Sequence, residues 1–166
     1  MLDTISKSRL DLVHPELSRR IYLLDSHLEV DGIHLRVVRG LATWSAQDAL
    51  YQQGRTTPGP IVTHAQAGYS AHNFGYAVDA APDDPSFPTW HPDWNELDDR
   101  WKELLAKAKD CGLAEGAEWR SVNPDYPHLY LRELPATPDE NLRAIFANQG
   151  ITGVFAEIDR VLAGSV

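Results

Sequence analysis

Four side chains in two short stretches of the sequence could together hold and use a metal ion. Residues 70–79 contain His72 and Asp79, and residues 125–128 begin with Asp125 and end with His128. Catalytic zinc usually takes three protein ligands and keeps a fourth position open for water or substrate. His72, Asp79 and His128 can be those three ligands, and Asp125 remains as a carboxylate that can move a proton. These residue types predict a zinc hydrolase.

The segment that contains Asp79 predicts how a metal would be approached. Residues 73–81 alternate as a strand does, with bulky side chains on one side and Gly75, Ala77 and Asp79 on the other. The small residues would leave open space beside Asp79, and Gly75 would allow a tight bend after His72. An unpaired buried carboxylate is costly, so Asp79 requires a cation or a donor. The alternative is a structural Asp79 with a His72 that caps a helix or loop.

Asp125 and His128 need a departure from regular strand geometry to reach one place. In a regular strand, residues three positions apart face opposite sides. Pro127 disfavours a helix interior and suits the first residue or the edge of a strand. We therefore expect a turn at residues 125–126 that leads into a strand at His128, with the acid above the metal.

The two stretches also resemble a known family. The pattern Ser-x-His-x-x-Gly-x-Ala-x-Asp, followed by an acidic residue three positions before a second His, resembles the zinc peptidases related to D-alanyl-D-alanine carboxypeptidases (M15 or VanY-like). Within that family the chain is most similar to phage endolysins that act as L-alanyl-D-glutamate peptidases. The resemblance covers about residues 8 to 132. Its further matching segments are 48–51, 53–56, 58–59, 61–63 and 118–119.

The resemblance implies a fold, a reaction and roles for single residues. The implied fold is α+β, with a small antiparallel sheet flanked by helices and the zinc site at one end of the sheet. The implied roles are ligands to one zinc ion for His72, Asp79 and His128, and general base for Asp125. The expected reaction is hydrolysis of the L-Ala–D-Glu bond in the peptidoglycan stem peptide during bacterial lysis.

Two other functions stay open on the sequence. A D-Ala–D-Ala carboxypeptidase or dipeptidase of wall metabolism would keep the chemistry and change the bond. A non-catalytic, zinc-stabilised wall-binding module would keep the ligands without the reaction. The presence of Asp125 beside a full ligand set argues against this last function.

Substrate-binding residues are less clearly marked than the metal ligands. Family members usually carry an Arg at the position that Ala42 occupies here, where it is thought to steady the oxyanion or substrate. Arg39 could reach the same space from another backbone position, or be a solvated strand-end residue. Arg55 could bind a substrate carboxylate or brace a loop through a salt bridge. Ser70 could bond substrate or brace its own loop, and Trp119 could line the cleft or serve as an aromatic core residue.

Three other residues are interpreted as outside the chemistry. His64 and His91 lie in predicted loops, where a lone His is more often a surface group, although either could contact and orient a residue of the site. Cys111 is the only cysteine, which excludes an internal disulfide and a Cys-based metal cluster. Its place at the end of an amphipathic helix predicts a buried, inert thiol.

The bulk properties predict one globular domain, residues 1–166, with residues 135–166 as a helical extension packed on it or, alternatively, a substrate-contacting or oligomerising arm. A net charge of −9 argues against nucleic acid as a partner. No apolar run approaches the roughly 20 residues that span a bilayer, so stable membrane insertion is not expected.

Residues 1–7 lack the pattern of a secretory signal. We therefore expect synthesis in the cytoplasm and action on the wall after release, aided by a holin-type pore without direct contact.

Hydrophobic periodicity and capping residues predict the elements. Ser45 is the expected cap of the second helix, Leu97 is expected on a buried stripe, and Thr137 is expected to begin a capping box with Pro138 at the first helical position. The expected helices are 14–28, 45–54, 95–111 and a pair in the tail separated at 150–153. The expected strands are 33–39, 73–81, 118–119 and 128–132, with loops at 55–70 and 82–94.

Overall fold

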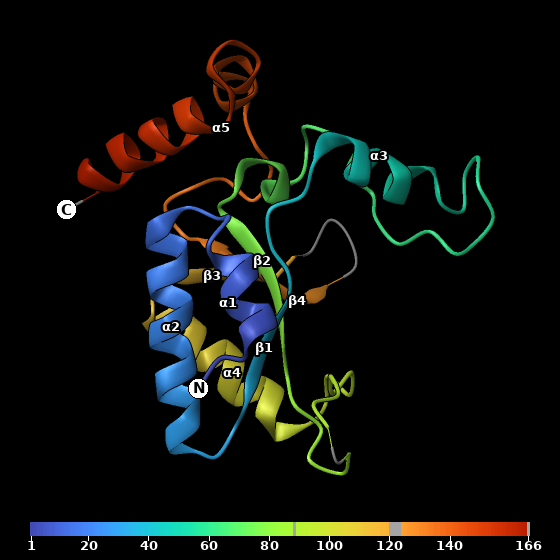
Figure 1. Ribbon diagram of the computed structural model, residues 1–166, viewed down its shortest axis with the longest axis vertical. Helices are drawn as coiled ribbons and strands as arrows, with labels where there is room; N and C mark the ends of the chain where they lie inside the picture. Colours follow the sequence, from blue (N-terminus) through green and yellow to red (C-terminus); the bar gives the residue numbers. More distant parts are fainter. Residues whose placement is uncertain (88, 120–123, 166) are drawn as a thin grey trace.

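The chain folds as an α+β domain around one small sheet, as the sequence predicts (Figure 1). The computed structural model describes residues 1–87, 89–119 and 124–165. The sheet has four antiparallel strands in the order β1-β2-β4-β3. The elements are α1 (Thr4–Leu10), α2 (Pro15–Val30), β1 (Leu35–Arg39), α3 (Trp44–Gln52), the 3-10 helix η1 (Ala71–Phe74), β2 (Ala77–Pro82), α4 (Asp99–Asp110), β3 (Leu113–Gly116), β4 (Asp125–Leu131) and α5 (Glu140–Ala163).

Helices α2 and α4 pack together and carry the core (Figure 1). The helix predicted over 14–28 is confirmed as α2, which starts with Pro15 and is capped by the His14 ring. Its apolar face is fully buried, and Trp101 and Leu104 of α4 are buried in the same cluster. The core residues of α2 are Leu17, Ile21, Leu24 and Leu28.

Helix α1, which the sequence interpretation missed, protects the edge of the sheet. β1 is an edge strand, and the backbone of Val37 would otherwise be left unpaired there. The Ser6 hydroxyl accepts a hydrogen bond from the Val37 N–H at 3.0 Å, and Arg9 donates to the Val37 carbonyl at 2.6 Å. The short helix therefore takes the place of a further strand.

Two predicted helix caps are wrong, each because a better acceptor lies nearby. Thr43, not Ser45, caps α3, since its hydroxyl accepts from the Ala46 N–H at 3.1 Å. Asp139, not Thr137, caps α5, because its carboxylate accepts from the Leu142 N–H at 2.8 Å and suits the positive end of a helix.

Helix α4 starts later than expected because turns compete with it. The Asp93 and Asn95 side chains accept hydrogen bonds from backbone N–H groups two residues ahead, which holds this stretch in turns. Asp98 then caps the helix. Leu97 therefore lies outside the helix and is 83% exposed, which corrects its place on the buried stripe. The loop predicted over 82–94 follows β2, and its described residues form no helix. Residue 88 lies outside the described part of the chain.

Two strands also differ from expectation. The strand predicted over 73–81 begins only at Ala77, because residues 71–74 form η1 and Gly75 ends it with a φ of 70°. Glu118 and Trp119 belong to a turn after β3, closed by the Trp119 N–H donating to the Gly116 carbonyl, rather than forming a strand themselves. The sequence interpretation missed β3, which pairs with β4 on the side opposite β2.

The C-terminal residues form two helical segments joined at Gly150, whose φ of 66° and ψ of −161° interrupt α5. The helix break predicted over residues 150–153 is therefore confirmed, and it occurs at residue 150. Val154 and Ile158 are fully buried in the main core, and α5 contacts η1 at the end of the sheet where β2 begins (Figure 1). None of the helices in the described ranges has the length and apolar character needed to cross a bilayer.

Candidate metal centre

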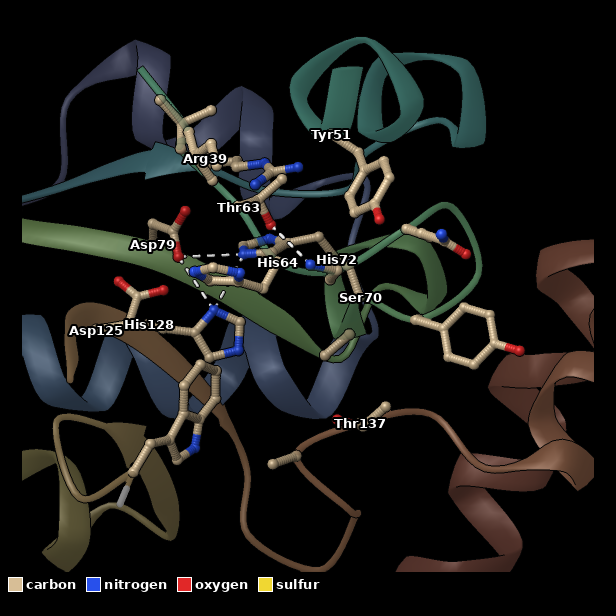
Figure 2. A pocket seen from close by; sticks show the side chains of 18 of the residues that line it. Arg39, Tyr51, Thr63, His64, Ser70, His72, Asp79, Asp125, His128 and Thr137 are labelled. Atoms are coloured by element: carbon tan, nitrogen blue, oxygen red, sulfur yellow. Dashed lines mark hydrogen bonds and ion pairs between the residues drawn. The ribbon is translucent and has the colours of Figure 1, made fainter. Parts of the chain in front are cut away.

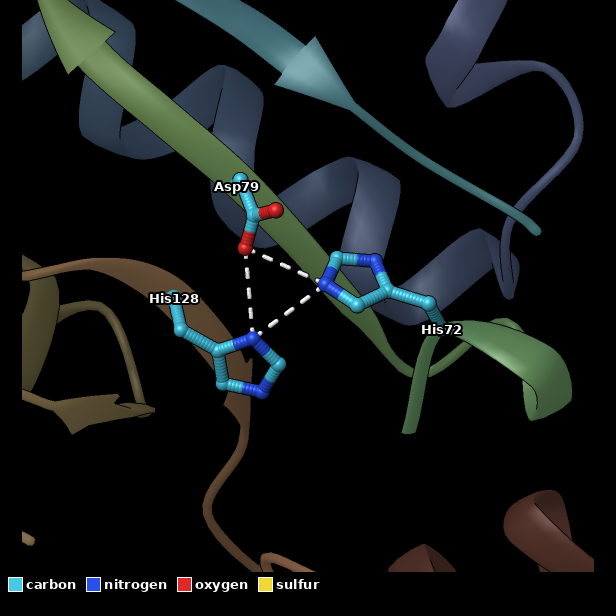
Figure 3. Close-up of side chains that lie close together, drawn as sticks. All are labelled: His72, Asp79 and His128. Carbon is cyan, nitrogen blue, oxygen red and sulfur yellow. Dashed lines mark hydrogen bonds and ion pairs between the residues drawn. The ribbon is translucent and has the colours of Figure 1, made fainter. Parts of the chain in front are cut away.

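Three side chains from three elements meet at one point (Figure 3). His72 comes from η1, Asp79 from β2 and His128 from β4, and Asp79 and His128 are directly paired across the two strands. His72 Nε2 lies 3.1 Å from Asp79 Oδ1 and 3.2 Å from His128 Nδ1. His128 Nδ1 lies 3.2 Å from Asp79 Oδ1. The structure therefore brings together the three residues predicted as ligands.

These spacings suit a single tetrahedral cation. Ligand atoms at zinc bond lengths of about 2.0–2.1 Å in tetrahedral geometry lie about 3.3 Å apart. The three separations, 3.1, 3.2 and 3.2 Å, come close to that value. Two nitrogens and one carboxylate oxygen also form a donor set that zinc accepts.

The hydrogen bonds around the imidazoles give a second test of the fit. His72 Nδ1 lies 3.0 Å from the Gly40 carbonyl, which can only accept, so Nδ1 carries the proton. In the neutral ring, Nε2 is then a bare lone pair that faces the Asp79 carboxylate. A cation between them removes this repulsion, and the bond to Gly40 is the outer partner that metal-bound histidines usually have. His128 Nε2 is buried without a partner among the described residues.

The carboxyls of the site have opposite pKa shifts. Burial alone would raise the pKa of Asp79, but the positive charge and hydrogen bonds of the two imidazoles in their protonated form outweigh burial and hold this pKa well below its ordinary value. Burial raises the pKa of Asp125, and the nearby Asp79 carboxylate raises it further. Asp79 thus suits a permanent anion, whereas Asp125 suits a group that gains and loses a proton.

A register shift, rather than the predicted turn, places Asp125 beside His128. β4 begins at Asp125, so the expected turn at 125–126 is wrong. Gly116 pairs with Asp125 and the preceding Glu115 pairs with Leu129, so extra residues of β4 are accommodated between these pairs. This irregularity breaks the alternation, and Figure 2 shows the Asp125 carboxylate beside Asp79 and His128.

Gly116 is a site residue that the sequence interpretation missed. A Cβ there would lie 2.6 Å from the Asp125 carbonyl oxygen and 3.1 Å from His128 Cβ. Only glycine therefore lets β3 approach the bulged part of β4. The signal would have been a glycine at the end of a strand, but that strand was not predicted.

Of the space that the small residues were predicted to leave beside Asp79, the part at Gly75 is filled. The bend there is confirmed by the φ of 70°, but a Cβ on Gly75 would meet Phe155 of α5 at 2.8 Å. Ala77 is fully buried as well. Gly75 therefore admits a helix of the same chain, and the approach to Asp79 lies elsewhere.

That approach is a cavity of about 810 Å³ whose lining includes all three cluster residues and Asp125. Arg39 also lines it, at the end of β1 opposite Asp79. Its guanidinium donates to Gln47 Oε1 at 2.6 Å, and the fully buried Gln47 donates to the Ala65 carbonyl at 2.7 Å. Arg39 is therefore a positioned group rather than a free strand-end residue. Gln47 was missed as a site residue, although a buried amide on a helix is a signal.

Arg55 is not among the residues that line the cavity. Its guanidinium donates to the carbonyls of Tyr51 at 2.5 Å and Thr63 at 3.1 Å, and it stacks on the Tyr51 ring. It braces the loop, through backbone oxygens rather than the salt bridge that was considered.

The other proposed site residues divide in the same way. Ser70, Trp119 and also His64 line the cavity, whereas His91 stacks on Phe87 with ring centres 4.0 Å apart. The Trp119 ring lies 5.0 Å from the His128 ring, and its indole nitrogen is buried without a partner in the described ranges. Cys111 is buried, and burial raises the pKa of its thiol.

Comparison with known proteins agrees with this geometry. Residues 63–131 match the family described as D-alanyl-D-alanine carboxypeptidase. The chain is 36% identical over 123 residues to the peptidoglycan L-alanyl-D-glutamate endopeptidase CwlK of Bacillus subtilis, a match covering 70% of this chain and 72% of CwlK.

Solved structures share the fold. The L-Ala D-Glu endopeptidase ChiX of Serratia marcescens superposes with a TM-score of 0.53 at 24% identity, covering 79% of this chain and 90% of ChiX. The D,D-dipeptidase VanXYg gives 0.55 at 17% identity, covering 83% of this chain and 55% of its own. The D,D-pentapeptidase VanY, in complex with Zn(II), gives 0.53 at 18% identity, covering 82% of this chain and 78% of its own.

Proposed function

Because the chain belongs to the M15, or D-alanyl-D-alanine carboxypeptidase, family of metallopeptidases, we propose that it is a zinc-dependent peptidoglycan hydrolase that cleaves the L-Ala–D-Glu bond of the stem peptide. The observation that carries this proposal is the meeting of His72, Asp79 and His128 beside Asp125 on one open cavity. The three residues would hold one zinc ion, and Asp125 would be the proton-transfer group.

Zinc, when bound there, polarises a carbonyl and lowers the pKa of bound water to roughly 7. Asp125 removes a proton from the attacking water and then delivers it to the amine of the departing D-Glu. Its raised pKa favours this exchange, since a carboxyl of ordinary pKa is a weaker base. The Gly40 carbonyl keeps the His72 ring in one tautomer and orientation.

Arg39 binds the negative charge of the substrate next to the cleaved bond. Gln47 holds its guanidinium at the cavity wall, so little conformational freedom is lost on binding. This residue takes the role that an Arg at the Ala42 position has in relatives. Ser70 and Trp119 contribute cavity wall around the peptide.

The choice of the L-Ala–D-Glu bond rests on the similarity to CwlK. The second candidate is a D-Ala–D-Ala peptidase, which the family description and the VanXYg and VanY structures favour. We further propose action on the wall as an endolysin during phage-induced lysis, following the endolysin-like residues in segments 48–63. A holin-type pore would give it access without direct contact.

Mass spectrometry of digested peptidoglycan tests the proposal. We expect new L-Ala C-termini and new D-Glu N-termini, which a chelator abolishes and added zinc restores. Release of free D-Ala without these ends would identify the second candidate. No new termini from folded, zinc-loaded protein that still binds the wall would point to a non-catalytic module.

A further inference from the structure

The cavity has a second wall that the reaction does not use. It is formed by Tyr51, Ile61, Val62 and Tyr69, which we call the tyrosine rim. Ile61, Val62 and Tyr69 are 50%, 52% and 47% exposed, which is unusual for large apolar side chains grouped around one cavity. Figure 2 shows Tyr51 on the side of the cavity away from Asp125. The rim therefore lies beyond the cluster, in the same cavity.

Both tyrosine rings are held from behind by a guanidinium. Arg55 lies 3.9 Å from the centre of the Tyr51 ring, and Arg143 of α5 lies 4.5 Å from the centre of the Tyr69 ring. Arg55 is itself fixed by two backbone carbonyls, and Arg143 donates to the Pro138 carbonyl. A cation on one face fixes each ring and leaves the opposite face for a ligand.

The guanidiniums of Arg55 and Arg143 lie behind the rim, but the cavity lining at the rim, unlike the rest of the lining, offers no carboxylate, lysine or arginine to a ligand. The lining residues between 51 and 70 include no Asp, Glu, Lys or Arg, whereas Arg39, Asp79 and Asp125 lie around the reaction centre. Aromatic faces and neutral polar groups such as Thr63, Gln66 and Ser70 suit a ligand with C–H faces and hydroxyl or amide groups. They do not suit a charged peptide, which would be left without partners.

We propose that the tyrosine rim binds the N-acetylmuramoyl sugar that carries the stem peptide. This inference rests on the proposed function, because L-Ala is joined directly to the lactyl group of that sugar. Cleavage after L-Ala thus places a neutral sugar ring one residue from the reaction centre, and the carboxylates of the peptide lie on the other side. The slightly positive C–H face of the ring packs on the negative face of a tyrosine.

Paired substrates test the rim. One is N-acetylmuramoyl-tetrapeptide, and the other is the same tetrapeptide with an acetyl group in place of the sugar. We expect wild type to cleave the first with a kcat/KM about tenfold higher, the size of one good aromatic contact. Tyr69→Ala and Val62→Ser should lose this preference and keep the rate on the acetyl-peptide. Tyr22→Ala, an exposed tyrosine of α2 outside the cavity lining, should keep the preference.

A binding measurement separates this inference from the proposed function. Saturation-transfer NMR with N-acetylmuramoyl-L-alanine should show contact to the sugar protons in wild type and lose it in Tyr69→Ala. Cleavage of both peptides at equal rates, with no sugar contact, would exclude sugar binding at the tyrosine rim and leave the proposed function unaffected. Sugar contact without any cleavage at L-Ala–D-Glu would support the rim and overturn the proposed function.

Discussion

The metal centre and the loop wall formed by residues 54–70 face the same cavity but are built differently. The cluster lies on β2, β4 and η1, where His72 and His128 are buried and each side chain faces the other two. The wall contains no helix or strand, and it is held by Arg55 and by side-chain bonds such as Gln53 to the Pro60 carbonyl. On the proposed function, the chemistry depends on paired elements of the fold, whereas the inferred recognition depends on an exposed loop. Substitutions in the first region should affect kcat, and those in the second should affect KM and substrate choice.

Removal of a cluster imidazole should have the largest effect. His72→Ala leaves two ligands, which do not hold zinc firmly, so bound zinc and hydrolysis should both fall to background. Metal content by atomic absorption and turnover of a stem peptide measure this. His64→Ala, a cavity residue outside the cluster, should keep its zinc. Full zinc content in His72→Ala would show that the cluster is not the site.

Loss of the proposed base should separate chemistry from metal binding. Asp125→Asn keeps the shape and removes the acid, so kcat should fall by about 10²–10⁴. Zinc content and the midpoint of thermal unfolding should stay near those of wild type. A kcat within about threefold of wild type would exclude Asp125 as the proton-transfer group.

Gly116→Ala asks whether backbone geometry alone supports the centre. The added methyl carbon must push the Asp125 backbone away, since it would lie 2.6 Å from its carbonyl oxygen. Misplacing the base by about an ångström should lower kcat by up to about a hundredfold. Gly164→Ala is the matched control, because its Cβ would meet nothing closer than 3.6 Å. Equal activity of both variants would mean that the register shift does not matter.

Substitution of the two arginines should give the smallest effects, and the two substitutions should change different quantities. Arg39→Ala should reduce kcat/KM about tenfold, the loss of one charge-assisted hydrogen bond to substrate. Arg55→Ala should change KM by only about twofold to threefold and lower the unfolding midpoint, because it braces the loop without lining the cavity. Kinetics on one stem peptide and calorimetry measure both. The reverse order would reassign the substrate anchor to Arg55.

What could be predicted from the sequence follows the same division. The four polar residues of the centre were identifiable because their types and local spacing are required by the chemistry, and α2 was identifiable from its periodicity. The start of α4 was not, because turns at Asp93 and Asn95 compete with the helix. The place of Asp125 was missed because it depends on Gly116, a distant partner in an unpredicted strand. Likewise, only the tertiary structure shows that Phe155 covers Gly75.

The position of zinc in crystals of the zinc-loaded protein, located by anomalous scattering, tests the central claim most directly. The account predicts one peak about 2.0–2.2 Å from His72 Nε2, Asp79 Oδ1 and His128 Nδ1, with the fourth position open toward Asp125. A peak bound by other residues, or no peak at these three atoms in fully active protein, would contradict it.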